Sequence, residues 1–137
     1  MISAMPDDRP EATAARSRPS DALAIAGARA LLALLVVAIG WLALSPRPPA
    51  VFSTGWDKGN HLLAFATLAV AASFGSVAAA RRRLAIALWL LGYGALIEVL
   101  QHWVPGRSSE FADLVADAVG IAFGLWLAGR LQRATLR

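Results

Sequence analysis

Residues 110–124 decide the fold, and they read EFADLVADAVGIAFG. In this apolar stretch Asp113, Asp117, Gly120 and Gly124 follow one another at spacings of four, three and four. The spacing places all four on one face of a helix, where the glycines form a small-residue surface that permits close packing. Ionisable side chains in a bilayer-crossing segment are costly unless they are paired or functional. The stretch therefore predicts a membrane helix whose acidic face points at another helix.

The rest of the chain is typical of an all-α polytopic membrane protein. It has 137 residues, of which 58% are hydrophobic, and a mean hydropathy of +0.57. A spanning helix needs about 20 apolar residues, and four stretches fit this length: 22–44, 61–80, 84–104 and 111–131. The expected organisation is a disordered cytoplasmic tail, a four-helix membrane domain and a basic C-terminal tail, over residues 1–20, 21–131 and 132–137.

Basic residues predict the orientation of these helices. One side holds Arg9, Arg16, Arg18, Arg81, Arg82, Arg83, Arg130, Arg133 and Arg137. The other side holds only Arg47, Lys58 and Arg107. Cytoplasmic segments carry the excess of lysine and arginine, so we expect both termini in the cytoplasm and residues 45–60 and 105–110 outside. Because topology accounts for the net charge of +4, we expect no nucleic-acid partner.

Polar side chains gather near the expected outer ends of the last three helices. The candidate site consists of Asp57, Lys58, His61, Glu98, Gln101, Arg107, Asp113 and Asp117. Glu98 and Asp117 lie away from the expected helix ends, and their short side chains cannot reach water cheaply. We therefore expect both to face inward. Asp57 and Asp113 can also complement helix N-termini, and Glu110 is expected to be a solvated acid of the first turn.

The charge balance of this candidate site leaves several chemistries open. Its four carboxyl groups face two permanent cations, Lys58 and Arg107. The excess can be absorbed by a protonated carboxyl group, by a protonated His61, or by a divalent cation held by oxygen ligands. No HExxH metal motif is present, no other cofactor is evident, and no nucleophile motif surrounds Ser108 and Ser109. The sequence therefore assigns no enzyme class.

The ordered set of motifs resembles the VanZ-like family of small bacterial membrane proteins. The resemblance rests on Asp57-Lys58-Gly59-Asn60-His61, Phe65, Glu98-Val99-Leu100-Gln101, Pro105-Gly106-Arg107, Asp113, Asp117, Gly120 and Gly124. It covers about half of the chain, from about residue 57 to 124. One departure is Asp117, where the family more often has an asparagine. This departure adds a carboxyl group to the candidate site.

The family takes its name from an accessory protein associated with teicoplanin-type glycopeptide resistance. The resemblance implies a multi-pass protein of the bacterial cytoplasmic membrane with a role at the cell envelope; antibiotic resistance is implied by the family name alone. The first functional hypothesis is a site near the outer leaflet that binds or modifies a lipid-linked envelope precursor or a membrane lipid headgroup, with Lys58 and Arg107 able to meet phosphate.

Two alternatives remain open at the level of sequence. Buried acids can relay protons or cations, which would require an oligomer because four short helices without an inverted repeat make a poor monomeric transporter. Buried ionic groups can also fix helix register in a structural subunit. The sequence does not encode the oligomeric state.

Overall fold

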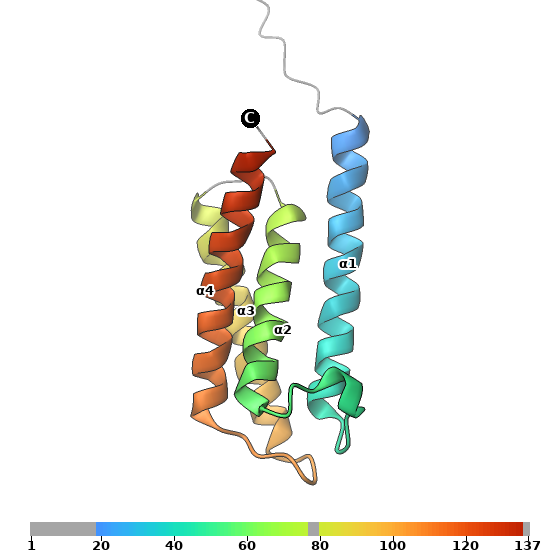
Figure 1. Cartoon of the computed structure of the whole chain (residues 1–137), viewed down its shortest axis with the longest axis vertical. Coiled ribbons are helices and arrows are strands. Elements are labelled where there is room, and N and C mark those ends of the chain that lie inside the picture. Colours follow the sequence, from blue (N-terminus) through green and yellow to red (C-terminus); the bar gives the residue numbers. More distant parts are fainter. Residues whose placement is uncertain (1–18, 77–79, 136–137) are drawn as a thin grey trace, which may run out of the picture.

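The structure is a computed structural model that describes residues 19–76 and 80–135. Its elements follow in the order α1 (Pro19–Leu44), η1 (Ala50–Phe52), α2 (Asp57–Phe74), α3 (Ala80–Gln101) and α4 (Phe111–Ala134). These described ranges contain no β-strand, so the expected all-α fold is confirmed. Figure 1 shows the four α-helices side by side along the long axis of the molecule.

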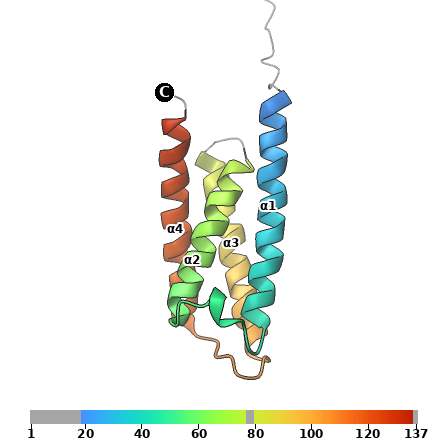
Figure 2. The ribbon, with the colours of Figure 1, turned by 45° about the vertical axis from the view of Figure 1, so that its right-hand side comes forward.

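The candidate site lies at one end of the bundle, where each of the four α-helices has one of its ends. There α1 and α3 end while α2 and α4 begin, at the bottom of Figure 1. We call it the polar end. The first residues of α1 and the last residues of α4 lie at the opposite end. In the described part of the chain, α1 contacts α2 and α3 but not α4, and the turned view in Figure 2 places α2 and α3 between α1 and α4.

Local chemistry sets the bounds of the first two α-helices. α1 ends at Leu44, as expected, because prolines in the following segment lack the amide donor that a helix needs. α2 spans Asp57–Phe74, whereas the sequence predicted 61–80. It begins a turn earlier than expected and ends early at its C-cap Gly75, since glycine disfavours continuation of a helix. Residues 77–79 lie outside the described residues.

A tight turn joins α3 to α4. α3 ends at Gln101, so the expected end at residue 104 was wrong. The Arg107 N–H donates to the Val104 carbonyl at 3.1 Å, and Gly106 has a φ of 82°. Proline followed by glycine with positive φ is typical of a type II turn. This turn closes the antiparallel hairpin that the sequence predicted between the third and fourth helices.

The N-terminal and C-terminal tails that the sequence predicted fall at the two limits of the described residues. Residues 1–18 lie outside the described residues, and α1 already begins at Pro19. At the other terminus α4 continues to Ala134 and therefore includes the first residues of the expected 132–137 segment.

Three of the helices have the length and hydropathy needed to cross a membrane. They are Ala22–Leu44, Arg81–Gln101 and Phe111–Ala134. α2 does not meet the same criteria of length and hydropathy, because its first turns carry polar side chains. Large apolar side chains such as Val37 and Leu88 are exposed on the outside of the bundle, where lipid favours them. The fold therefore belongs to a membrane protein.

The glycines of α4 bring it into close contact with α2. A methyl group at Gly120 would collide with the backbone of Leu62 and Ala66, and one at Gly124 would collide with the Ala66 carbonyl and the Ala69 side chain. Both glycines are buried. The small-residue face predicted for residues 110–124 is thus the surface on which α2 packs.

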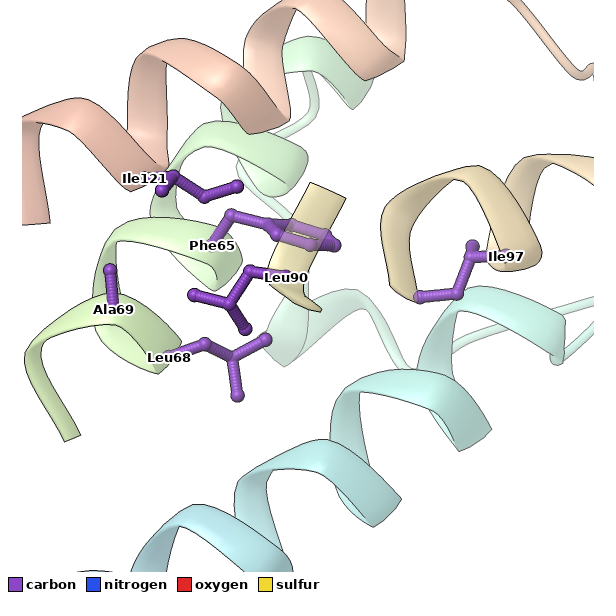
Figure 3. Close-up of a cluster of buried hydrophobic side chains, with 6 residues drawn as sticks. All are labelled: Phe65, Leu68, Ala69, Leu90, Ile97 and Ile121. Atoms are coloured by element: carbon purple, nitrogen blue, oxygen red, sulfur yellow. The ribbon is translucent and has the colours of Figure 1, made fainter. Parts of the chain in front are cut away.

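The apolar core lies mainly between α2, α3 and α4. It contains Phe65, Leu68, Ala69, Leu90, Ile97 and Ile121, drawn in Figure 3. α1 covers this core with partly buried side chains such as Leu35 and Ile39. Because α2 contributes half of the core and touches every other helix, it is the central helix of the bundle.

Side chains from two other helices satisfy the C-terminal carbonyls of α2. The Arg29 Nε donates to the Gly75 carbonyl at 2.9 Å, and the Gln132 Nε2 donates to the Ser73 carbonyl at 3.1 Å. Helix ends leave such carbonyls without intrahelical partners. These bonds therefore fix α1 and α4 against α2 at the end opposite the candidate site.

The glycine contact predicts a sharp difference between two alanine substitutions. Gly120→Ala should lower the free energy of unfolding by about 1–3 kcal/mol, because the added methyl group meets backbone atoms that cannot move aside. Gly92→Ala is the matched control, since nothing lies within 4 Å of a methyl group there. Unfolding in mixed detergent micelles, followed by circular dichroism, measures both; equal stability of the two variants would contradict the packing described here.

Candidate functional site

The predicted site residues lie together at the polar end of the bundle. His61, Glu98, Asp113 and Asp117 form what we call the buried polar cluster; Asp113 and Asp117 are 0% exposed, and the other two are nearly buried. Gln101 is also buried, whereas Asp57, Lys58 and Arg107 keep part of their surface exposed. The cluster draws its side chains from α2, α3 and α4.

His61 is the centre of this cluster. Its Nδ1 lies 2.9 Å from Asp117 Oδ1, and its Nε2 lies 3.8 Å from Glu98 Oε1. An ionised carboxylate can only accept hydrogen bonds, so the contact with Asp117 requires the proton on Nδ1. One imidazole ring thus connects a helix on each side of α2.

Asp113 is buried beside a lysine. Lys58 Nζ lies 3.5 Å from Asp113 Oδ1, but its shorter contact, 2.7 Å, is with Glu110 Oε2. Neither carboxylate oxygen of Asp113 accepts a hydrogen bond from the described residues. A buried acceptor without a partner costs free energy. Asp113 is therefore the group of the cluster whose bonding capacity is least used.

Glu110 has a partner that the sequence did not reveal. It was expected to be a solvated first-turn acid, and it is half exposed, yet it forms the ion pair with Lys58. The hydrogen bond from the Lys58 ammonium lowers the pKa of Glu110 below its ordinary value. Nothing local distinguishes this acid in the sequence; only the fold brings residue 58 beside it.

Glu98 lies in the last turn of α3, because that helix ends at Gln101. The expectation that Glu98 lies away from a helix end was therefore wrong. Its Oε2 accepts a hydrogen bond of 3.0 Å from the backbone N–H of Glu110, the N-cap residue of α4. A carboxylate is favourable at a helix N-terminus. The other oxygen, Oε1, is buried, faces His61 and accepts no hydrogen bond within residues 19–76 and 80–135.

Arg107 and Gln101 hold the end of α1. Arg107 donates from Nε to the Ser45 carbonyl at 3.1 Å and from Nη2 to the Leu42 carbonyl at 2.7 Å. Gln101 Nε2 donates to the Ala43 carbonyl at 3.0 Å. These contacts tie α1 to the hairpin of α3 and α4. The sequence did contain a signal that such contacts were needed. The proline after α1 ends the helix, and the last carbonyls of a helix require hydrogen-bond donors from elsewhere.

The two cations of the site are therefore already engaged. Lys58 binds Glu110 and Asp113, and Arg107 binds backbone carbonyls and lies 3.9 Å from Asp57 Oδ1. The sequence had suggested that both could meet phosphate. In the structure their main contacts are within the protein, and the buried polar cluster keeps an excess of acceptors.

A cavity of about 290 Å³ opens beside His61, between α1, η1, α2 and α3. Its polar lining includes Asp57, Asn60, His61, Gln101 and Arg107. Its apolar lining includes Ile39, Ala64, Phe65 and Ile97. In α2 and α3 the apolar lining residues lie about one helical turn farther from the polar end than the polar ones, whereas the end of α1 and the segment after it contribute apolar residues such as Leu42 and Phe52. Along α2 and α3 the lining is thus polar near the end of the bundle and apolar toward its middle.

Three residues of this region have the arrangement of metal ligands. One carboxylate oxygen each from Asp57 and Asp113 and one nitrogen of His61 all lie within 4.8 Å of one another. Carboxylate and imidazole groups are common ligands of divalent metal ions.

Long apolar helices, apolar outer faces and a buried polar cluster define the class of protein: a multi-pass α-helical membrane protein. The chain matches the family model described as VanZ/LLP1 over residues 22–132, and it belongs to this VanZ-like family. The match includes α1, which the motifs found in the sequence did not reach. No curated protein and no solved structure matches the chain.

Proposed function

We propose that this protein crosses the bacterial cytoplasmic membrane four times, with both termini in the cytoplasm and the polar end at the outer leaflet. The arginines of residues 81–83 and 130–133 support this orientation, because they belong to the end opposite the candidate site. The exposed aromatic rings of Trp41, Trp56 and Trp103 belong to segments at the polar end, as expected of residues at a membrane interface.

α2 is the fourth span in this proposal. Its 18 residues cover about 27 Å at the usual helical rise of 1.5 Å per residue, close to the ~30 Å of a bilayer core. Its low hydropathy comes from the first turns, where His61 faces inward and is buried. A central helix surrounded by three apolar helices needs less apolar surface of its own.

Cysteine labelling tests this topology, because the chain has no cysteine of its own. Ser108→Cys lies in the turn between α3 and α4, and Thr135→Cys lies at the end of α4; both positions are exposed. A membrane-impermeant maleimide should label Ser108→Cys in intact cells and Thr135→Cys only after the membrane is opened. Labelling of Thr135→Cys in intact cells would contradict the orientation.

For the activity, we propose that the cavity beside His61 binds the headgroup of a membrane lipid or lipid-linked envelope precursor. The observation that carries this proposal is the amphipathic lining of the cavity, whose α2 and α3 walls are polar near the polar end and apolar one turn deeper. A lipid in the outer leaflet has the same order of groups along its length. A cavity of about 290 Å³ suits a headgroup and the first part of a chain.

The polar lining indicates which headgroup chemistry fits. Gln101 Oε1 is a buried acceptor without a hydrogen-bond partner among the described residues, and Asp57 adds an exposed carboxylate. Arg107 donates mainly to α1 carbonyls. A ligand that donates hydrogen bonds, through sugar hydroxyls or an ammonium group, matches this surplus of acceptors. Lipid-linked envelope precursors belong to this class through their sugars.

A variant that fills the cavity without removing a polar group tests the proposal. Arg107 and Gln101 are unsuitable, because their loss would release α1. Ala64→Phe places a ring in the apolar half of the cavity. Leu63→Phe is the matched control, since Leu63 is exposed on the neighbouring face of α2. Native mass spectrometry of protein extracted from bacterial membranes should show retained lipid in the wild type and Leu63→Phe, and at least tenfold less in Ala64→Phe.

If Ala64→Phe does not fold, Ile39→Phe fills the same cavity from the α1 side and serves as the second variant. Retention of the same lipid in the same amount by a folded cavity-filling variant would overturn the proposal. So would a wild-type protein that retains no lipid.

A further inference from the structure

We propose that Asp57, His61 and Asp113 form a binding site for a divalent transition-metal ion, with Glu98 as a fourth ligand. This inference rests on the distances between these side chains and on their unused acceptors, not on the headgroup proposal, although two of the ligands also line the cavity. The four ligands come from α2, α3 and α4, so the ion would join three helices at the polar end.

Distances between the candidate ligand atoms fit a shared ion. Metal bonds to imidazole nitrogen and carboxylate oxygen are about 2.0–2.2 Å long, so two atoms bound to one ion lie about 3–4.4 Å apart. The atoms offered by Asp57, His61 and Asp113 lie within 4.8 Å of one another. The Asp57 side chain is partly exposed and therefore has room to adjust.

His61 is oriented as a metal ligand. Its Nδ1 is 2.9 Å from Asp117 Oδ1. With Asp117 ionised, Nδ1 carries the ring proton, and a neutral ring then has its lone pair on Nε2. Metal-bound histidines usually donate their other ring N–H to a carboxylate or carbonyl in this way, which fixes the ring and raises its basicity. Asp117 is a positioning residue in this arrangement. Its carboxyl group, the departure from the family pattern, is a stronger acceptor for this N–H than an asparagine amide.

A second observation points to an ion independently of the three-residue arrangement. Glu98 Oε1 is buried, accepts no hydrogen bond from any described residue, and lies 3.8 Å from His61 Nε2. When the imidazole is neutral with its proton on Nδ1, these two atoms are both acceptors, and their separation matches two ligands of one cation. Both oxygens of the fully buried Asp113 also lack hydrogen-bond partners in the described ranges. A divalent cation would offset the cost of burying these carboxylates.

Lys58 does not replace such an ion. Its ammonium lies 3.5 Å from Asp113 Oδ1, but its 2.7 Å contact is with Glu110. This leaves Asp113 Oδ2 and Glu98 Oε1 without a hydrogen-bond donor among the described residues. The single charge of Lys58 is also shared between two carboxylates.

The ligand set favours Zn²⁺ or Mn²⁺ over Ca²⁺ or Mg²⁺. The last two prefer oxygen ligands alone, whereas one imidazole with carboxylates suits first-row transition metals. At an N/O site of fixed geometry Zn²⁺ binds more tightly than Mn²⁺. Asp57 and His61 also line the cavity, so the ion would lie at its polar end.

Titration with Zn²⁺ tests the site directly. Chelator-treated protein in detergent, without added lipid, is titrated with Zn²⁺ in a calorimeter. We expect about one ion per chain in the wild type, and affinity at least tenfold weaker in Asp113→Asn and His61→Gln, as is typical when metal coordination is disturbed. His102→Gln is the matched control, because His102 is exposed beside Trp103 at the same end of the bundle; it should bind Zn²⁺ like the wild type.

If a variant of a buried ligand does not fold, Asp57→Asn remains available, because Asp57 is exposed and its removal leaves no buried group unpaired. It should also weaken binding by at least tenfold. A wild-type protein that binds no Zn²⁺, or folded ligand variants that bind it as tightly as the wild type, would overturn the inference. So would equal loss of binding in His102→Gln, which would indicate adventitious surface binding. Since the titration contains no lipid, its failure leaves the headgroup proposal untouched.

Discussion

The polar end of this protein depends on the close approach of α4 to α2. Gly120 and Gly124 allow the two backbones to touch at Leu62 and Ala66. Asp117 precedes Gly120 by one turn on the same helix face, so the contact brings its carboxylate to His61 on α2. A side chain at either glycine would push the helices apart and leave a carboxylate in an apolar region without its partner, which is costly. The packing of the small residues and the burial of the acidic groups therefore depend on the same contact between α2 and α4.

From that contact the polar side chains connect the remaining helices. Glu98 of α3 faces His61 with one oxygen and binds the N-terminus of α4 with the other. Arg107 and Gln101 then donate hydrogen bonds to the backbone carbonyls at the end of α1. Most donors are used in these structural contacts, while several buried acceptors have no donor among the described residues. This imbalance makes the site chemically distinctive: it favours a bound cation, or a ligand that brings its own hydrogen-bond donors.

The fold and the candidate site could be predicted to different depths. Periodic acids and glycines in residues 110–124 were sufficient to place one face of α4 against another helix, and the Pro-Gly turn predicted the hairpin. The end of α2 at Gly75 was missed because residues after it are as apolar as those before it. The roles of α1 and Glu110 were missed for a different reason. Their partners are far away in the sequence, and the proline after α1 indicates only that the last carbonyls need donors, not which residues supply them.

The contact between His61 and Asp117 is the central claim, and solid-state NMR of the protein in bilayers tests it most directly. With ¹⁵N-labelled histidine and ¹³C-labelled aspartate, the His61 Nδ1 should carry a proton and show a dipolar contact with the Asp117 carboxyl carbon. His102 serves as an internal reference, since it is exposed and its ring lies edge-on to the neighbouring Trp103 ring. A His61 ring without a proton on Nδ1, or without contact to the Asp117 carboxyl group, would contradict the account.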